Sequence, residues 1–137
     1  MARMRELEFR VWEEREKEYD TWSYILDDSG NLFRNAYGAL IECDKKDYII
    51  EQYTGLKDKN GQKIYEGDIV TFLVECFNNV TLGFESEDWH TAVVEWNQDD
   101  ACYSFMVRDV PFSVRYEAEV IGNIHKQPEL LEANDVD

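Results

Sequence analysis

The side chains best suited to catalysis or metal binding are two histidines, His90 and His125, and three cysteines, Cys43, Cys76 and Cys102. A cysteine nucleophile needs a base within hydrogen-bond reach, and a metal site needs several His, Cys or carboxylate ligands that converge. The histidines stand 35 residues apart (125 − 90), and no cysteine lies within four residues of another. Because this spacing fits neither a disulfide framework nor a zinc site, we predict no catalytic residue, no metal and no cofactor.

Carboxylates next to glycine are the remaining candidates for chemistry. Glu66 and Asp68 flank Gly67 and could form an acid–base pair, but an acidic residue beside glycine at a strand entry is more typical of a turn. Asp58 precedes Gly61 by three residues, whereas a calcium-binding EF-hand loop needs a separation of five. The chain also has no phosphate-binding glycine loop and no nucleophile elbow. We therefore expect a protein that is not an enzyme; a small enzyme with an unrecognised site is an alternative.

The acidic residues are spread unevenly along the chain. The formal net charge is −16, and residues 71–137 hold 14 acidic and 3 basic side chains, a net −11. Contact with nucleic acid or with an anionic membrane surface needs clustered Lys and Arg, so we predict no direct nucleic-acid binding and no membrane binding. Two readings of the acidity stay open: solubility, and a functional role through a basic partner or through imitation of nucleic acid.

Nothing in the chain resembles a membrane span or an export signal. No apolar run approaches the roughly 20 residues that cross a bilayer, and the N-terminal residues Met1–Glu6 are charged. We expect a cytoplasmic protein.

The polar and apolar pattern predicts strands along most of the chain. Leu7, Phe9 and Val11 alternate with charged residues, as in a half-buried strand, and short apolar segments follow up to residue 50. Residues 69–77, 92–96, 103–107 and 119–124 predict further strands, whereas residues 82–90 read as a long acidic loop. Gly122 inside the last strand indicates a bend or a close backbone approach. Pro128 can begin a short helical turn.

A hairpin is predicted at the centre of the chain, where Asn60-Gly61 tolerates the backbone of a tight turn. A two-residue turn would place Leu56 opposite Tyr65. A type I turn that ends on a left-handed Gly61 is the alternative. The structural motif comprises Asn60, Gly61, Tyr65, Gly67 and Asp68.

These elements predict a mainly β fold with little helix. An N-terminal β-meander (residues 1–50) would pack on a central hairpin and SH3-like small barrel (51–127), followed by a short helical turn and acidic tail (128–137). The three parts would form one compact unit.

Three segments resemble the YopX family of bacteriophage and prophage proteins: Arg5–Trp12, Gln52–Val70 and Glu119–Leu131. Their order matches, and they span nearly the whole chain. The resemblance implies a β-rich fold with an SH3-like barrel and an origin in a phage genome, and hence a place in the host cytosol. It implies no activity and no catalytic residues.

We therefore expect a non-enzymatic module that contacts an unknown host or phage protein. An acidic mimic of nucleic acid that blocks a host DNA-binding protein is the second hypothesis. An edge strand that pairs with a second copy would give a homo-oligomer. Trp89 is expected to be exposed in its acidic loop, whereas Trp96 is expected in the core. The candidate partner surface is Glu85, Glu87, Asp88, Trp89, His90, Asp99 and Asp100.

Overall fold

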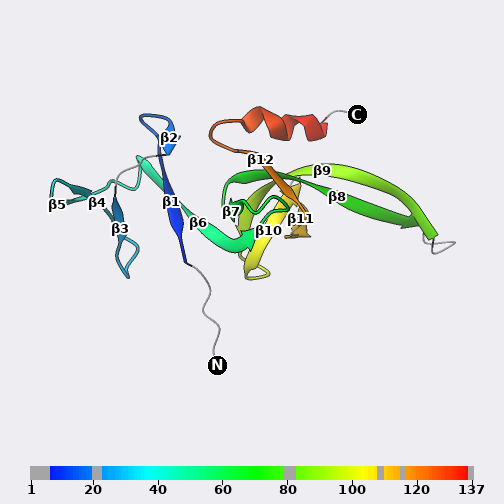
Figure 1. The fold of residues 1–137 in the computed structure, drawn as a ribbon, viewed down its shortest axis with the longest axis horizontal. Coiled ribbons are helices and arrows are strands. Elements are labelled where there is room, and N and C mark those ends of the chain that lie inside the picture. The colour runs from blue at the N-terminus through cyan, green and yellow to red at the C-terminus, as the bar shows by residue number, and fades with distance from the viewer. Residues whose placement is uncertain (1–6, 20–22, 79–82, 108–109, 115–116, 136–137) are drawn as a thin grey trace, which may run out of the picture. The chain divides into compact units, whose positions relative to one another are not determined.

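The computed structural model describes residues 7–19, 23–78, 83–107, 110–114 and 117–135, with the side chains of 75–78, 83–88 and 133–135 left undescribed (Figure 1). Within these ranges the elements are β1 (Phe9–Glu13), β2 (Glu18–Tyr19), β3 (Tyr24–Leu26), β4 (Leu32–Ala36), β5 (Ala39–Glu42), β6 (Tyr48–Lys57), β7 (Lys63–Tyr65), β8 (Asp68–Asn78), β9 (Gly83–Asn97), β10 (Cys102–Val107), β11 (Val110–Ser113), β12 (Glu119–Asn123) and the 3-10 helix η1 (Pro128–Asp135). The prediction of a mainly β chain with little helix is confirmed.

The strands form three sheets with the orders β2-β1-β6-β7, β3-β4-β5 and β11-β10-β9-β8-β12. The sheets are curled; the SH3-like small barrel stays a prediction. The chain divides into two compact units: the first is Glu8–Gln52, and the second combines Leu7 with the residues from Tyr53 onward.

The first unit buries one small apolar cluster. Val11, Leu32 and Cys43 are buried at its centre, and Tyr24, Leu26, Tyr48, Ile50 and Phe9 pack around them. The alternation predicted for β1 explains this, because Phe9 and Val11 face the cluster while Arg10, on the other face, donates its Nε–H to Glu51 Oε1 at 2.8 Å. The Tyr19 hydroxyl donates to the same oxygen at 2.8 Å. Glu51 is thus a buried carboxylate with two donors.

The β4–β5 hairpin of this unit has a turn whose first residue is conformationally unfavourable. Ala36 pairs with Ala39, and both residues between them have positive φ, 53° at Tyr37 and 88° at Gly38. This is the geometry of a type I′ turn, in which Asn-Gly is the preferred pair. Tyr37 is fully exposed, so packing does not compensate for its strained backbone.

Replacing Tyr37 with Asn is expected to stabilise the first unit by about 0.5–1 kcal/mol, because Asn adopts the left-handed region at lower cost than Tyr. Urea unfolding followed by hydrogen exchange of peptides from residues 23–50 measures the gain. Tyr37→Phe is the control and should leave stability unchanged, since Phe meets the same backbone cost. An equal gain from both variants would show that loss of the exposed hydroxyl, and not the backbone, is responsible.

The second unit is built on the long β8–β9 pair. Figure 1 shows these two strands as long green ribbons that run side by side, and their register pairs Ile69 with Val93 at one end and Asn78 with Gly83 at the other. The core on one face consists of residues from β7 to β10 and the residue before β12, all buried: Ile64, Val70, Phe72, Ala92, Val94, Phe105, Val107 and Ala118. The apolar run predicted for residues 69–77 is therefore a strand whose first part is deeply buried, at Ile69, Val70 and Phe72, and whose Leu73 and Val74 are half-buried.

The central hairpin has the second of the two predicted turn geometries. Gly61 N–H donates to the Asp58 carbonyl at 3.0 Å, and Gly61 has a φ of 82°. Lys57 pairs with Lys63 and Tyr53 with Tyr65, with a bulge between them that contains Gly55 at a φ of 90°. The Leu56–Tyr65 contact was therefore wrong: Leu56 is exposed, and the Tyr65 ring packs against the Tyr53 ring at 5.6 Å.

Gly122 confirms both alternatives that the sequence raised for it. The register between β12 and β8 shifts between Val120 and Gly122, which is a bulge. A Cβ atom at Gly122 would lie 2.7 Å from Gln127 Oε1 and 3.0 Å from Leu130 Cδ1, so a larger residue would make these two side chains shift. The helical turn predicted from Pro128 is present as η1.

Candidate interaction surface

The residues of the central motif have structural roles. Asp68 is buried, and its Oδ2 accepts the Tyr65 N–H at 2.8 Å. Gly67 has a φ of 84°, donates its N–H to the Val94 carbonyl at 2.9 Å and accepts from Ile124 N–H at 2.9 Å. Asp68 and Gly67 thus fix the entry of the chain into β8.

Asp58 joins this hairpin to a strand 62 residues further along the chain. Its Oδ1 accepts the N–H groups of Asn60 and Gln62, both at 2.9 Å, and its Oδ2 accepts the Val120 N–H at 3.0 Å. Burial acts to raise the pKa of Asp58, but the hydrogen bonds from Val120, Gln62 and Asn60, together with the charge of Lys59, outweigh it and lower the pKa. The carboxylate that resembled part of a calcium loop therefore organises the turn.

The acidic loop predicted at residues 82–90 was wrong. Residues 83–90 are the first half of β9 and pair with β8, with Phe72 opposite His90 and Leu73 opposite Trp89. The local composition is polar and acidic, yet backbone pairing with β8 runs through this segment, with one bulge, and so overrides weak local strand propensity.

Trp89 and His90 lie on opposite faces of the β8–β9 ribbon, because successive side chains of a strand alternate. The His90 ring stacks on Phe112 at 5.8 Å and lies 6.0 Å from Phe72, so this imidazole packs on the aromatic core. Trp89 is 64% exposed, as expected, opposite Leu73. We call Leu73 and Trp89 the ribbon patch.

Three acidic members of the predicted partner surface belong to the same strand. Glu87 pairs with Glu75 and Asp88 with Val74, and Glu85 lies at a bulge where the register shifts between Cys76 and Phe77. The backbones of Glu87 and Asp88 are therefore in a regular ladder and that of Glu85 is at its bulge, and the side chains of all three lie outside the described part of the structure.

Asp99 and Asp100 lie at the opposite end of β9, in the turn to β10. Asn97 Oδ1 accepts their N–H groups at 3.1 and 3.3 Å, and Asn97 Nδ2 donates to Asp100 Oδ2 at 3.0 Å. Eight residues of strand separate Trp89 from Asn97, or up to roughly 27 Å. The structure thus divides the predicted surface into two separate places.

The prediction that Trp96 packs in the core was wrong. Trp96 is 46% exposed, packs edge to face against Tyr103 at 5.1 Å, and donates its indole N–H to Gln98 Oε1 at 3.0 Å. It shares the core-facing side of β9 with Val94 but lies beyond the end of the core. The turn residues that follow it in the sequence, from Asn97 to Asp100, are the signal that could have placed it at a strand end.

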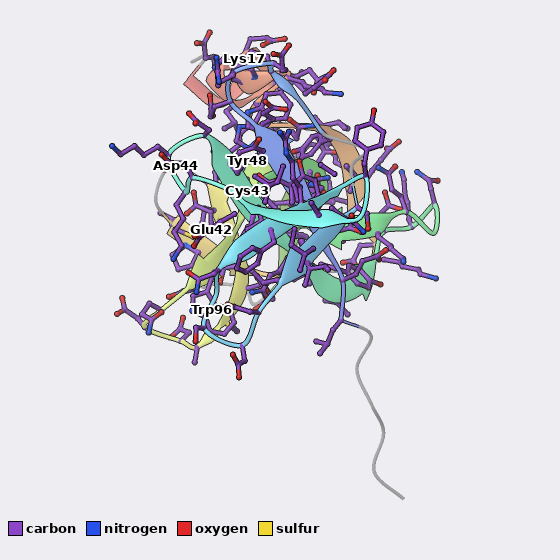
Figure 2. The ribbon with its side chains drawn as sticks, turned by 90° about the vertical axis from the view of Figure 1, so that its left-hand side faces the viewer. Lys17, Glu42, Cys43, Asp44, Tyr48 and Trp96 are labelled. Atoms are coloured by element: carbon purple, nitrogen blue, oxygen red, sulfur yellow. The ribbon has the colours of Figure 1, made fainter. Side chains whose placement is uncertain are left out.

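A shallow depression of about 440 Å³ lies in the first unit, lined by Asn31, Leu32, Glu42, Cys43, Asp44 and Lys45. Figure 2 shows Glu42, Cys43 and Asp44 one after another where β5 ends. Cys43 is buried, and Cys102 in the second unit is an exposed free thiol. Among the described residues, no group of three or more His, Cys, Asp or Glu side chains could hold a metal ion. No helix in the same part of the chain is long and apolar enough to cross a membrane.

Comparison with known proteins assigns the family. The family described as YopX protein matches residues 8–132. The chain belongs to the YopX family. Among solved structures, the YopX-family chain is similar to protein EF1440 from Enterococcus faecalis, with 27% identity, 93% of this chain and 99% of that chain covered, and a TM-score of 0.57. It is also similar to protein yopX from Bacillus subtilis, with 22% identity, coverages of 90% and 96%, and a TM-score of 0.46. A search of curated proteins found no match.

Proposed function

We propose that this YopX-family protein is a non-enzymatic interaction module, encoded by a phage or prophage and acting in the host cytosol. The ribbon patch binds a protein of the host or the phage. The observation that supports this most is the 64% exposure of Trp89 on a regular strand. Tryptophan is a large apolar side chain that is seldom left in water, and it is enriched among the residues that dominate binding energy.

The position of the ribbon patch favours contact with a partner. Within the described residues, β12 pairs with β8 between Asp68 and Thr71, and β10 pairs with β9 between Val93 and Asn97. The ladder of β8 and β9 continues past both regions, so the ribbon patch lies on a two-stranded extension of the sheet (Figure 1). A partner can approach such an extension without meeting neighbouring strands.

The test is affinity enrichment from cells in which the phage or prophage is induced, with quantification of each bound protein. Trp89→Ala should reduce recovery of the specific partner by about tenfold or more, as for a binding hot spot. Tyr37→Asn is the matched control, because it also removes a fully exposed aromatic side chain, and it should bind like the parent protein.

Two outcomes would contradict the proposal: equal recovery of every protein by the parent and Trp89→Ala, or recovery of no saturable partner. A partner that duplex DNA displaces from the protein would instead favour imitation of nucleic acid. Because Trp89 is exposed, its replacement should change stability by less than about 1 kcal/mol, so lost binding would not reflect unfolding.

A further inference from the structure

An aromatic pair, the exposed Trp96 and the half-buried Tyr103, lies at the β9–β10 end of the second unit, away from the ribbon patch. Trp96 and Tyr103 are opposite each other in the ladder, with ring centroids 5.1 Å apart and planes at 77°. Figure 2 shows Trp96 close to the turn between these strands. We call Trp96, Tyr103, Asp99 and Asp100 the turn patch.

The Trp96 ring is held in place before any ligand arrives. Its indole N–H donates to Gln98 Oε1 at 3.0 Å, so the polar edge of the ring is already satisfied. Tyr103 supports the ring edge to face, yet Trp96 is still 46% exposed. Because the N–H is already bonded, the exposed part of Trp96 offers a ligand mainly ring carbon, and the π face of an indole attracts cations.

The adjacent turn is also fixed. Asn97 accepts two backbone N–H groups through Oδ1, and its Nδ2 donates to Asp100 Oδ2 at 3.0 Å and lies 3.5 Å from Ser104 Oγ. Asp99 and Asp100 are both exposed. The turn thus presents two carboxylates on a rigid loop, close in sequence to the aromatic ring.

The charge of the surrounding sequence indicates a cationic partner. No Lys or Arg occurs from Ile64 to Val107, a stretch that includes all of β8, β9 and β10. The complement of an open indole face beside two carboxylates is a cation with a planar or apolar part. A guanidinium meets this description best, because it stacks on aromatic rings and binds carboxylates.

We propose that the turn patch binds an arginine-bearing segment of a polypeptide, with the guanidinium on the Trp96 face and Asp99 and Asp100 as counter-charges. This contact is separate from the ribbon patch. Loss of one does not imply loss of the other, because Trp89 lies near the middle of β9 and Trp96 at its end.

The test uses the full chain labelled with ¹⁵N and follows the indole N–H signals of Trp96 and Trp89 by NMR. The probe is acetyl-Gly-Arg-Gly-Arg-Gly-amide, and the control peptide carries Gln in place of each Arg. The Trp96 signal should shift in a saturable way with the Arg peptide only, while the Trp89 signal stays in place.

Variants separate a specific site from general attraction to an acidic protein. The signals of Tyr103 and the turn backbone report binding when Trp96 is replaced. Trp96→Ala, and independently the pair Asp99→Asn with Asp100→Asn, should each weaken binding about three- to tenfold. The pair Glu16→Gln with Asp28→Asn removes two exposed charges elsewhere and should change affinity less than about twofold. Equal weakening by both charge pairs, or no saturable shift of Trp96, overturns the proposal.

Discussion

Replacing Asp58 with Ala is expected to destabilise the second unit by about 2–4 kcal/mol, because three backbone N–H groups lose one shared acceptor. The Val120 N–H matters most. Its bond to Asp58 Oδ2 joins the hairpin turn to β12, and the neighbouring bond from Lys59 N–H to the Ala118 carbonyl at 3.0 Å depends on the same alignment. Urea unfolding, followed by hydrogen exchange of peptides from residues 53–78 and 117–135, measures the loss.

Two control variants test whether the loss of stability comes from the Asp58 carboxylate. Asp58→Asn keeps one carbonyl oxygen that can accept hydrogen bonds from the turn, so it should lose less stability than Asp58→Ala. Asp28→Ala removes an exposed carboxylate from the first unit and should change stability by less than about 0.5 kcal/mol. If Asp58→Ala proved no more destabilising than Asp28→Ala, the carboxylate would have no part in holding β12.

The same carboxylate predicts a pH dependence. The pKa of Asp58 is lower in the folded protein than its ordinary value of 3.8, so the carboxylate binds fewer protons folded than unfolded. Its stabilisation is therefore fully present above the ordinary pKa and is lost as pH falls through the folded pKa. The stability difference between the parent protein and Asp58→Asn should shrink below about pH 4. The pKa of Asp27 is also lowered, chiefly by the Asn31 backbone N–H. Asp27 is present in both proteins, so its contribution cancels when the unfolding free energy of Asp58→Asn is subtracted from that of the parent. A difference that stays constant down to pH 2 would contradict this role.

Replacing Phe72 with Ala is expected to cost about 3–5 kcal/mol, the usual loss for a fully buried phenylalanine. Phe72 has no exposed surface and contacts two further phenylalanines, Phe105 at 5.1 Å and Phe112 at 5.6 Å between ring centroids, as well as the His90 ring. Its removal would leave a cavity at the point where the two-stranded extension begins. Urea unfolding measures the total loss of stability. Hydrogen exchange of residues 68–78 shows whether the two-stranded extension of β8 and β9 opens before the rest of the unit.

Leu73→Ala is the matched control for Phe72, because Leu73 is the next residue and points to the opposite face of β8. Leu73 is only half-buried, so its loss should cost about 1 kcal/mol. Comparable losses for the two variants would mean that the described core does not lie mainly on the Phe72 face.

Much of the fold could be read from local sequence. Alternation placed Phe9 and Val11 toward the core, since the side chains of a strand point to opposite faces in turn. The prediction was wrong for Leu7, which precedes β1 and is 79% exposed. The glycine positions were equally informative. Gly61 adopts the left-handed backbone conformation, and Gly122, which has no side chain, allows the close approach of Leu130. These features depend on one residue and its neighbours, and so they leave a trace in the sequence.

The candidate surface was less predictable, because exposure depends on where the core ends. Trp89 was correctly expected to be exposed, but for the wrong reason: it lies on a strand and not in a loop. Trp96 resembles a core residue by its alternation with Val94, yet the core stops before it. Neither fact is local, because both follow from which strands lie beside β9.

The sequence by itself determined the family, the β-rich class and the turn at Asn60-Gly61, because these depend on residue types at short range. Only the tertiary structure decided the hairpin register, the strand through residues 83–90 and the division of the acidic surface into two places. The physical reason is the same in each case. Backbone hydrogen bonds and carboxylate contacts from distant residues, such as Asp58 to Val120 and β8 to β9, outweigh weak local preferences.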